Sequence, residues 1–205
     1  MAAGTEIIMK TAAGTIHADV QRQAGALTRA FVTALQAPSA GPAGSAEDAA
    51  ATLGIALDDL AFAPAAYSAG VPYFFVPVVS RTLLSRVRLD LAHWTRSFRD
   101  AWASAIFVYT MDDWTHGGEV HARMFGPGVG IPEDPATGSA AAALAGVLRD
   151  IQRLDAGEPE WIVHQGQDMG RPSAIRIEAT VSAGMVTQAR IGGTAVRRIE
   201  GTMRL

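Results

Sequence analysis

The residues with the clearest chemical potential lie between Phe125 and Ala145, where a pair of acids is followed by a Gly-Ser step. Glu133 and Asp134 come just before residues 137–139, which we expect to open a helix. The first amides of a helix have no partner within it, and with the positive end of the helix dipole they form an anion site. An acid or base beside such a site suits proton transfer on a small carboxylate substrate. The plainer alternative is a Pro-Gly turn followed by an ordinary helix cap.

The two acids are not equivalent. Adjacent side chains of an extended segment point to opposite faces, so Glu133 and Asp134 are not expected to reach the same substrate. Pro135 favours an extended conformation at Asp134. Two roles stay open for Asp134: an acid or hydrogen-bonding group at a substrate cleft, or a structural cap of the helix that follows.

Other kinds of site have less support in the sequence. His116 and His121 flank Glu119, but no third ligand stands at a metal-binding spacing, so we expect no metal. The Gly-x-Ser-x-Gly elbow of many serine hydrolases does not occur. The glycine-rich segment 126–130 is not followed by Gly-Lys-Ser/Thr, which argues against a phosphate-binding loop.

The composition is that of a globular protein with one or two domains. The chain has 205 residues, of which 49% are apolar and 18% charged. A net charge of −3 argues against a nucleic-acid-binding protein. The chain has no cysteine, so disulfides and thiol nucleophiles are impossible. No apolar run is long enough to predict a membrane span, and a cytoplasmic location is the default expectation.

The elements that must position the acidic segment alternate between strand and helix signals. Residues 140–148 are apolar on all sides and are expected to form a helix enclosed by sheet. Residues 71–79 are an apolar run that contains two prolines, which suggests an edge strand or a bend. Helices are expected at 45–54 and 89–102, and a linker at 38–44. Further strands are expected at 6–11, 14–20, 26–32, 104–110, 119–125, 161–164, 174–181, 185–191 and 194–199, with turns at 182–184 and 192–193.

Several longer motifs resemble those of the PhzF family, the phenazine-biosynthesis-like isomerases. The resemblance rests first on Arg-Met-Phe at 123–125, Pro127, and Gly-Ile-Pro-Glu-Asp-Pro-Ala-Thr-Gly-Ser-Ala-Ala at 130–141. It covers nearly the whole chain, although members of that family are usually longer and their amino-terminal part is expected to be missing here. Its other motifs are Tyr-Ser-Ala-Gly-Val-Pro at 67–72, Gln-Gly at 165–166, Gly-Arg-Pro-Ser at 170–173 and Gly-Gly at 192–193.

The resemblance implies an α+β fold similar to diaminopimelate epimerase and proline racemase. In that fold a mixed β-barrel wraps around a central helix, twice over, with the active cleft between the barrels. The resemblance implies a catalytic role for Asp134 and substrate contacts by Gly138 and Ser139. Thr137 is also expected to contact the substrate at the start of the helix, and Gly70 to line the same cleft through the loop at 68–72. It implies no metal and no organic cofactor. The family's proton-transferring glutamate, in a Ser-Glu-(Thr/Ser) motif, and its substrate-contacting histidine are not found in this sequence.

On this basis residues 1–37 are expected to be the remnant of a truncated first barrel domain and 38–44 a linker. Residues 45–205 are expected to form the second barrel domain, whose last strand can return to the first. Two functions stay open: a PhzF-like isomerase or epimerase that transfers a proton on a small carboxylate-bearing metabolite, or a catalytically silent domain kept for small-anion binding or assembly. Exposed strand edges predict a homodimer, or a complementary chain that supplies the missing part. Neither nucleic acid nor a membrane is expected as a partner.

Overall fold

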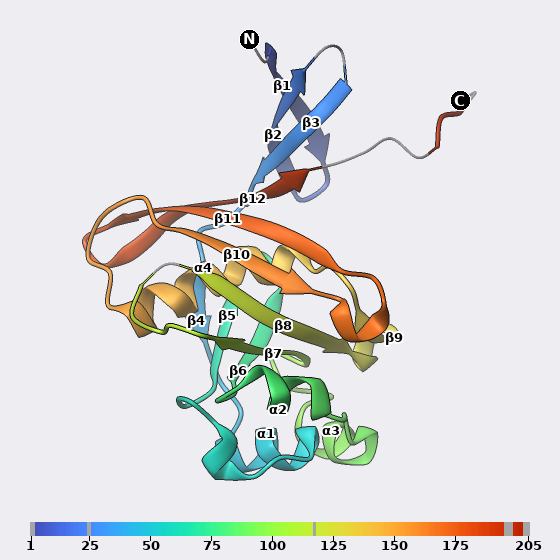
Figure 1. The fold of residues 1–205 in the computed structure, drawn as a ribbon, viewed down its shortest axis with the longest axis vertical. Coiled ribbons are helices and arrows are strands. Elements are labelled where there is room, and N and C mark those ends of the chain that lie inside the picture. The colour runs from blue at the N-terminus through green and yellow to red at the C-terminus, as the bar shows by residue number, and fades with distance from the viewer. Residues whose placement is uncertain (1–2, 24–25, 117, 195–198, 203–205) are drawn as a thin grey trace.

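In a computed structural model that describes residues 3–23, 26–116, 118–194 and 199–202, a mixed sheet curls around one long helix, and shorter helices lie outside it (Figure 1). The described sheet has 12 strands in the order β1-β2-β3-β12-β11-β10-β8-β7-β6-β5-β4, and β9 pairs with β8. The pairs β6–β7 and β8–β10 are parallel. No described helix is long and apolar enough to cross a membrane.

The strands are β1 (Ala3–Thr11), β2 (Gly14–Gln23), β3 (Ala26–Thr33), β4 (Ser39–Gly41), β5 (Ala65–Ser68), β6 (Pro72–Pro77), β7 (Ala105–Met111), β8 (Glu119–Gly126), β9 (Ile131–Asp134), β10 (Glu160–Gln165), β11 (Ser173–Ser182) and β12 (Met185–Thr194). The α-helices are α1 (Ala46–Leu53), α2 (Arg81–Arg86), α3 (Leu91–Ser97) and α4 (Gly138–Gln152). Short 3-10 turns occupy Leu57–Asp59, Pro127–Val129 and Gln167–Met169.

Helix α4 is the centre of the main core, as its apolar sequence predicts. Every residue from 140 to 148 is buried, and β4, β5, β6, β11 and β12 pack against the helix. Its small side chains let neighbouring elements approach closely. At Gly146, for example, a Cβ atom would lie 2.6 Å from the ring of Tyr67. The helix ends at Arg153, whose backbone is left-handed with φ of 52°. Burial of residues 140–148 fixes the position of the helix and of its amino end.

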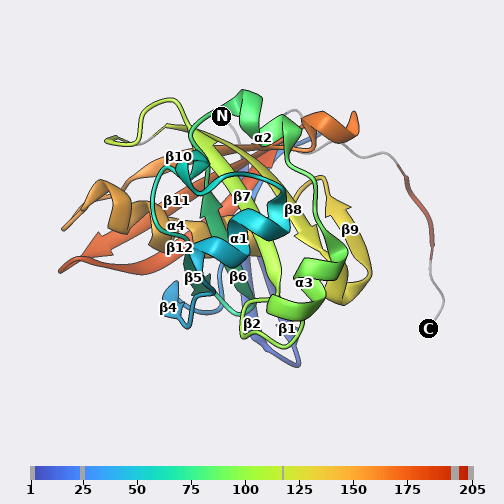
Figure 2. The ribbon, with the colours of Figure 1, turned by 90° about the horizontal axis from the view of Figure 1, so that it is seen from below.

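A second core lies on the other face of the sheet, under α1, α2 and α3 (Figure 2). Phe74 of β6 and Phe98 pack with ring centroids 5.0 Å apart, and Trp94 is buried in the same cluster. Both faces of β6 are therefore covered. The prediction of an edge strand at 71–79 is wrong, because Pro72 and Pro77 stand at the two ends of β6 and leave its inner residues free to pair with β5 and β7.

Helix α3 is shorter than the helix predicted over 89–102. The Asp90 side chain accepts a hydrogen bond from the His93 amide at 2.9 Å, which starts the helix at Leu91. The helix ends at Ser97, and the side chain of the next residue, Phe98, is buried in the second core. The predicted linker at 38–44 also differs from the structure, because it contains the short strand β4.

Strands β1, β2 and β3 form an antiparallel meander that extends beyond the body of the molecule (Figure 1). We call this meander the arm. β12 runs from β11 in the body to β3 in the arm, and Arg190 to Thr194 pair with Thr33 to Arg29. The turn predicted at 192–193 is therefore wrong: β12 continues through both glycines. Most of the strand predicted at 194–199 lies outside the described residues.

The close approach of β12 to β3 explains the glycine at position 192. A Cβ atom there would lie 2.1 Å from the Ala30 carbonyl oxygen and 2.8 Å from the Phe31 Cα atom. We expect Gly192→Ala to lower the free energy of unfolding by about 2 kcal/mol, because the two backbones must separate. Urea unfolding measures this change. Gly4→Ala in β1 is the matched control, since no atom of a described residue lies within 4 Å of its Cβ position. Equal stability of the two variants would contradict the prediction.

Candidate active site

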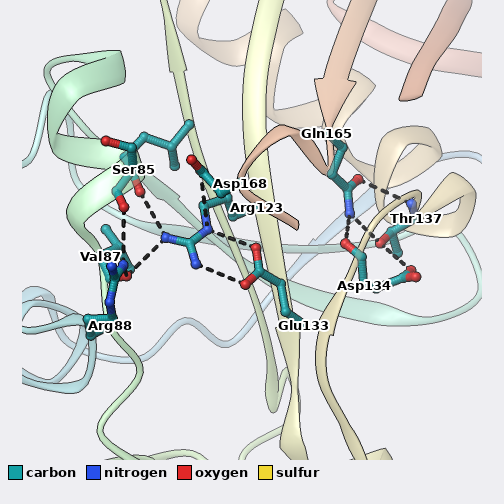
Figure 3. Close-up of polar contacts among 10 residues, drawn as sticks. Ser85, Val87, Arg88, Arg123, Glu133, Asp134, Thr137, Gln165 and Asp168 are labelled. Carbon is teal, nitrogen blue, oxygen red and sulfur yellow. Dashed lines mark hydrogen bonds and ion pairs between the residues drawn. The ribbon is translucent and has the colours of Figure 1, made fainter. Parts of the chain in front are cut away.

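The predicted site residues gather where β9 ends and α4 begins. Thr137 is the residue before the first turn of α4, and its hydroxyl donates a hydrogen bond to Asp134 Oδ2 at 2.6 Å. Glu133 points the other way, toward Arg123 (Figure 3). The expectation that the two neighbouring acids face different partners is confirmed. Asp134 is partly exposed, and Ser139 in the first turn of α4 is exposed.

Gln165, at the end of β10, holds this junction together. Its side chain is completely buried and accepts a hydrogen bond from the Thr137 amide at 3.1 Å. Its amide nitrogen donates to the Asp134 carbonyl oxygen at 2.6 Å and to the Thr137 hydroxyl at 2.9 Å (Figure 3). The expectation that the Thr137 amide is available to a ligand is therefore wrong. The amides of Gly138 and Ser139 donate to no other residue that the structure describes.

A cavity of about 340 Å³ opens beside the amino end of α4, at the junction of the arm and the body. We call it the α4 cavity. The cavity can take a small metabolite, because ligand sites start at about 300 Å³. Of the predicted site residues, Gly138 lies in its wall. The residues that line it are Val32, Ala136, Gly138, Ser173, Ala174, Ile175, Ile191, Gly192, Gly193 and Thr194.

Two hydroxyl groups meet at the first turn of α4. The Tyr73 hydroxyl, from β6, lies 2.7 Å from Ser139 Oγ. Burial raises the pKa of Tyr73, the hydrogen bond with Ser139 lowers it, and the negative charge of Asp134 raises it. The net upward shift of this pKa keeps Tyr73 protonated at neutral pH, so its O–H remains a donor near Asp134 and Ser139.

Gly70 lies in the turn between β5 and β6, with a φ of 123° that favours glycine. Its amide donates to Ser68 Oγ at 3.0 Å. Gly70 is not among the residues that line the α4 cavity. The turn connects to the site through Tyr73, which follows three residues later on β6.

On the opposite side of β9, buried Arg123 forms an ion pair with half-buried Glu133. Two guanidinium nitrogens of Arg123 donate to the two carboxylate oxygens of Glu133, each at 2.8 Å. A third nitrogen donates to the carbonyl oxygens of Val87 at 2.9 Å and Leu84 at 3.2 Å. The hydrogen bonds to Glu133 raise the pKa of Arg123. The pair anchors β9 one residue before Asp134.

His121, one of the two histidines considered as metal ligands, contacts another histidine. His121 stacks on His164 of the adjacent strand, with ring centroids 5.0 Å apart and an angle of 14° between the rings. Burial lowers the pKa of His121. His164 Nε2 lies 3.5 Å from a Glu119 carboxylate oxygen. Within the described ranges, no three His, Asp or Glu side chains gather in an arrangement suited to a metal ion.

Comparison with known proteins shows which family the sequence is similar to. The sequence profile of the phenazine biosynthesis-like protein family (PhzC-PhzF) matches residues 1–201. An uncharacterized isomerase of Mesorhizobium japonicum is 41% identical over 159 residues, which are 75% of this chain and 53% of that protein. A trans-2,3-dihydro-3-hydroxyanthranilate isomerase of Pseudomonas fluorescens is 30% identical over 97% of this chain and 67% of its own length.

Solved structures show the same fold. A PhzF-family protein of Bacillus anthracis superposes with a TM-score of 0.77 at 23% identity, over 95% of this chain and 67% of that protein. A hydroxyproline epimerase of Agrobacterium vitis gives a TM-score of 0.56 at 13% identity, over 93% of this chain and 56% of that protein. These neighbours confirm the predicted α+β, epimerase-like fold.

The chain spans about half the length of the curated relatives it matches first, 53% of the Mesorhizobium protein and 44% of an uncharacterized isomerase of Deinococcus radiodurans. The family's profile nevertheless covers nearly all of the present sequence. The fold, the central helix and the Glu-Asp-Pro-Ala-Thr-Gly-Ser segment occur together as expected from the resemblance. The chain belongs to the phenazine biosynthesis-like protein (PhzC-PhzF) family.

Proposed function

We propose that the chain takes part in an isomerase or epimerase reaction that moves a proton on a small carboxylate-bearing metabolite without a metal or organic cofactor. One observation carries the proposal: the Asp134 carboxylate binds the hydroxyl of Thr137, the residue before Gly138, and Gly138 lies in the wall of a cavity of about 340 Å³ with its amide bound to no other described residue. Relatives of this chain that bear the name isomerase support the same reaction type.

In the proposed mechanism, the Gly138 and Ser139 amides hold the substrate carboxylate at the positive end of the α4 dipole. They also stabilise the negative charge that develops when the neighbouring carbon loses its proton. Asp134 acts as an acid or base on one side of the substrate, and the Ser139 and Tyr73 hydroxyls orient the bound group. We propose that a group outside the described residues handles the other proton.

A second candidate function is a silent anion-binding or assembly module. The wall of the α4 cavity favours it, because none of the residues that line the cavity carries a titratable side chain. The Asp134 carboxylate also accepts a hydrogen bond from the Thr137 hydroxyl, a contact that suits a structural role at the junction of β9 and α4. In this alternative the site binds a small acid without catalysing proton transfer.

Proton exchange in deuterated water separates the two functions. Suitable probes are trans-2,3-dihydro-3-hydroxyanthranilate and trans-4-hydroxy-L-proline, which the names of two similar proteins suggest. The full chain is incubated with each probe, and proton NMR follows the loss of carbon-bound hydrogen. Enzyme-dependent exchange supports the isomerase, and saturable binding without exchange supports the silent module. If neither probe binds near Gly138, the proposal of a carboxylate site at α4 fails.

We also propose that a second copy of the chain covers the arm. β1 ends the described sheet, and the exposed fractions of Ile7, Ile8 and Met9 are 42%, 56% and 40%. An open edge with apolar side chains favours pairing between strands of two molecules.

Light scattering is expected to give twice the chain mass of 21.5 kDa. Ile8→Lys should shift the protein toward monomer, because a charge then lies on the paired surface. Met185→Lys, at the far hairpin of β12, is a matched control, since Met185 is 60% exposed. A monodisperse wild-type monomer would contradict the proposed dimer.

A further inference from the structure

A second cavity, of about 510 Å³, lies across β9 from Asp134. We call it the Phe125 cavity, after the ring of β8 in its wall. Its walls also include residues 87–89, which follow α2, Leu91 at the start of α3, and Pro132 of β9. The volume falls in the range of sites for small organic ligands, about 300–1,000 Å³, and the lining is mainly apolar. Nothing in the proposed isomerase reaction uses this cavity.

The buried arginine in the wall of this cavity, Arg123, is already paired with carboxylates. Arg123 is bound through two hydrogen bonds by Glu133, and its guanidinium lies 5.0 Å from the centre of the Phe125 ring. The same guanidinium donates to two backbone carbonyls, so four of its five N–H groups are engaged. Asp168 Oδ2 also lies 3.7 Å from Arg123 Nε, so the Arg123 charge is not available to a ligand.

The cation available to a ligand is Arg88, at the rim of the same cavity. One terminal nitrogen of its guanidinium donates to the carbonyl oxygens of Ser85 at 3.1 Å and Val87 at 2.8 Å. These bonds hold the guanidinium in place, and its other N–H groups contact no partner among the described residues. No described carboxylate forms an ion pair with Arg88. The Arg88 guanidinium is thus held by the backbone, and its positive charge has no described carboxylate as a partner.

We infer that the Phe125 cavity binds a small organic anion with an apolar body. The carboxylate of this ligand pairs with Arg88, and an aromatic or branched aliphatic group fills the space between Phe125, Leu91 and Pro132. Because Pro132 and Glu133 belong to β9, the ligand contacts the strand that ends at Asp134, from the face opposite the α4 cavity. This inference goes beyond the proposed isomerase function and does not depend on it.

The test is a titration of the ¹⁵N-labelled full chain with 3-phenylpropionate, with 3-phenylpropan-1-ol as the uncharged analogue. Amide shifts are expected at Leu89, Leu91 and Gly130, with the carboxylate bound about tenfold or more tightly than the alcohol, as a charge-assisted hydrogen bond implies. Arg88→Gln should remove this preference. Arg86→Gln, an exposed arginine on α2 that does not line the cavity, is the matched control and should keep it.

Leu91→Glu is a second variant that does not depend on Arg88. Leu91 is 58% exposed and begins α3, where a negative charge is compatible with the helix dipole. The variant should bind the carboxylate much more weakly and the alcohol only slightly less. The inference is overturned if 3-phenylpropionate causes no saturable shifts at millimolar concentrations, or if the shifts centre on Gly138. It is also overturned if the alcohol binds as well as the acid, or if Arg86→Gln weakens binding as much as Arg88→Gln.

Discussion

Asp134→Asn is expected to slow deuterium exchange on a bound acid by about 100-fold or more. General acid–base groups contribute about 10²–10⁴ in rate, and an amide cannot exchange a proton at neutral pH as a carboxylate does. The amide oxygen can still accept the Thr137 hydroxyl, so the amino end of α4 should keep its structure. Exchange is measured by proton NMR in deuterated water, and probe binding is measured in parallel.

The matched control is Asp100→Asn, which removes the same charge from an exposed turn after α3. This variant should exchange like the unchanged chain. Unaltered exchange in Asp134→Asn would show that Asp134 is a helix cap and not a catalytic group. Loss of both exchange and probe binding, with an intact fold, would instead give Asp134 a role in binding.

Gln165→Leu is expected to lower the free energy of unfolding by about 3 kcal/mol. Leucine has a similar size but leaves the Thr137 amide and the Asp134 carbonyl without their partner, and each buried unsatisfied group costs about 1–3 kcal/mol. The lost hydrogen bonds lie at the junction of β9, β10 and α4. The carboxylate probes of the proposed site at α4 should therefore also bind more weakly.

Urea unfolding of Gln167→Leu provides the comparison. Gln167 is exposed in the turn that follows β10, and the same substitution there should change the free energy of unfolding by less than about 0.5 kcal/mol. A loss below about 1 kcal/mol in Gln165→Leu would mean that water or a rearranged Thr137 satisfies the junction.

Much of the fold follows from local sequence patterns. The apolar run at 140–148 has no polar face, so only an enclosed helix satisfies it, and the structure places it at the centre of the core. The turn predicted at 182–184 joins β11 to β12, and the helix predicted to open at residue 45 begins there, with Ser45 as its cap. These elements were predictable because their physical cause lies within a few residues.

The errors arise where distant residues decide the conformation. Glycines 192 and 193 read as a turn, but β3 packs so closely that the strand needs glycine. Pro72 and Pro77 suggested an edge strand, because the sequence does not show where the strand begins and ends. Pairing with β5 and β7 places the two prolines at the ends of β6. The length of α3 is set by the cap at Asp90 and by Phe98, whose side chain is buried in the second core.

The candidate site was predictable in part. The order of Glu133 and Asp134 along an extended strand indicated their opposite orientations. Gln165 was marked only as part of a Gln-Gly motif, and its contacts with Thr137, 28 residues away, required the pairing of β10 beside β8. Tyr73 had no signal of its own in the sequence, because its hydroxyl reaches Ser139 across 66 residues.

The ladder between β3 and β12 does two things at once. It ties the arm to the body, and its residues Val32, Ile191 and Gly192 are also part of the wall of the α4 cavity. A tilt of the arm therefore changes the width of that cavity. By thermodynamic reciprocity, a compound bound in this cavity stabilises one orientation of the arm. A partner that stabilises the same orientation of the arm raises the affinity for the compound by the same factor.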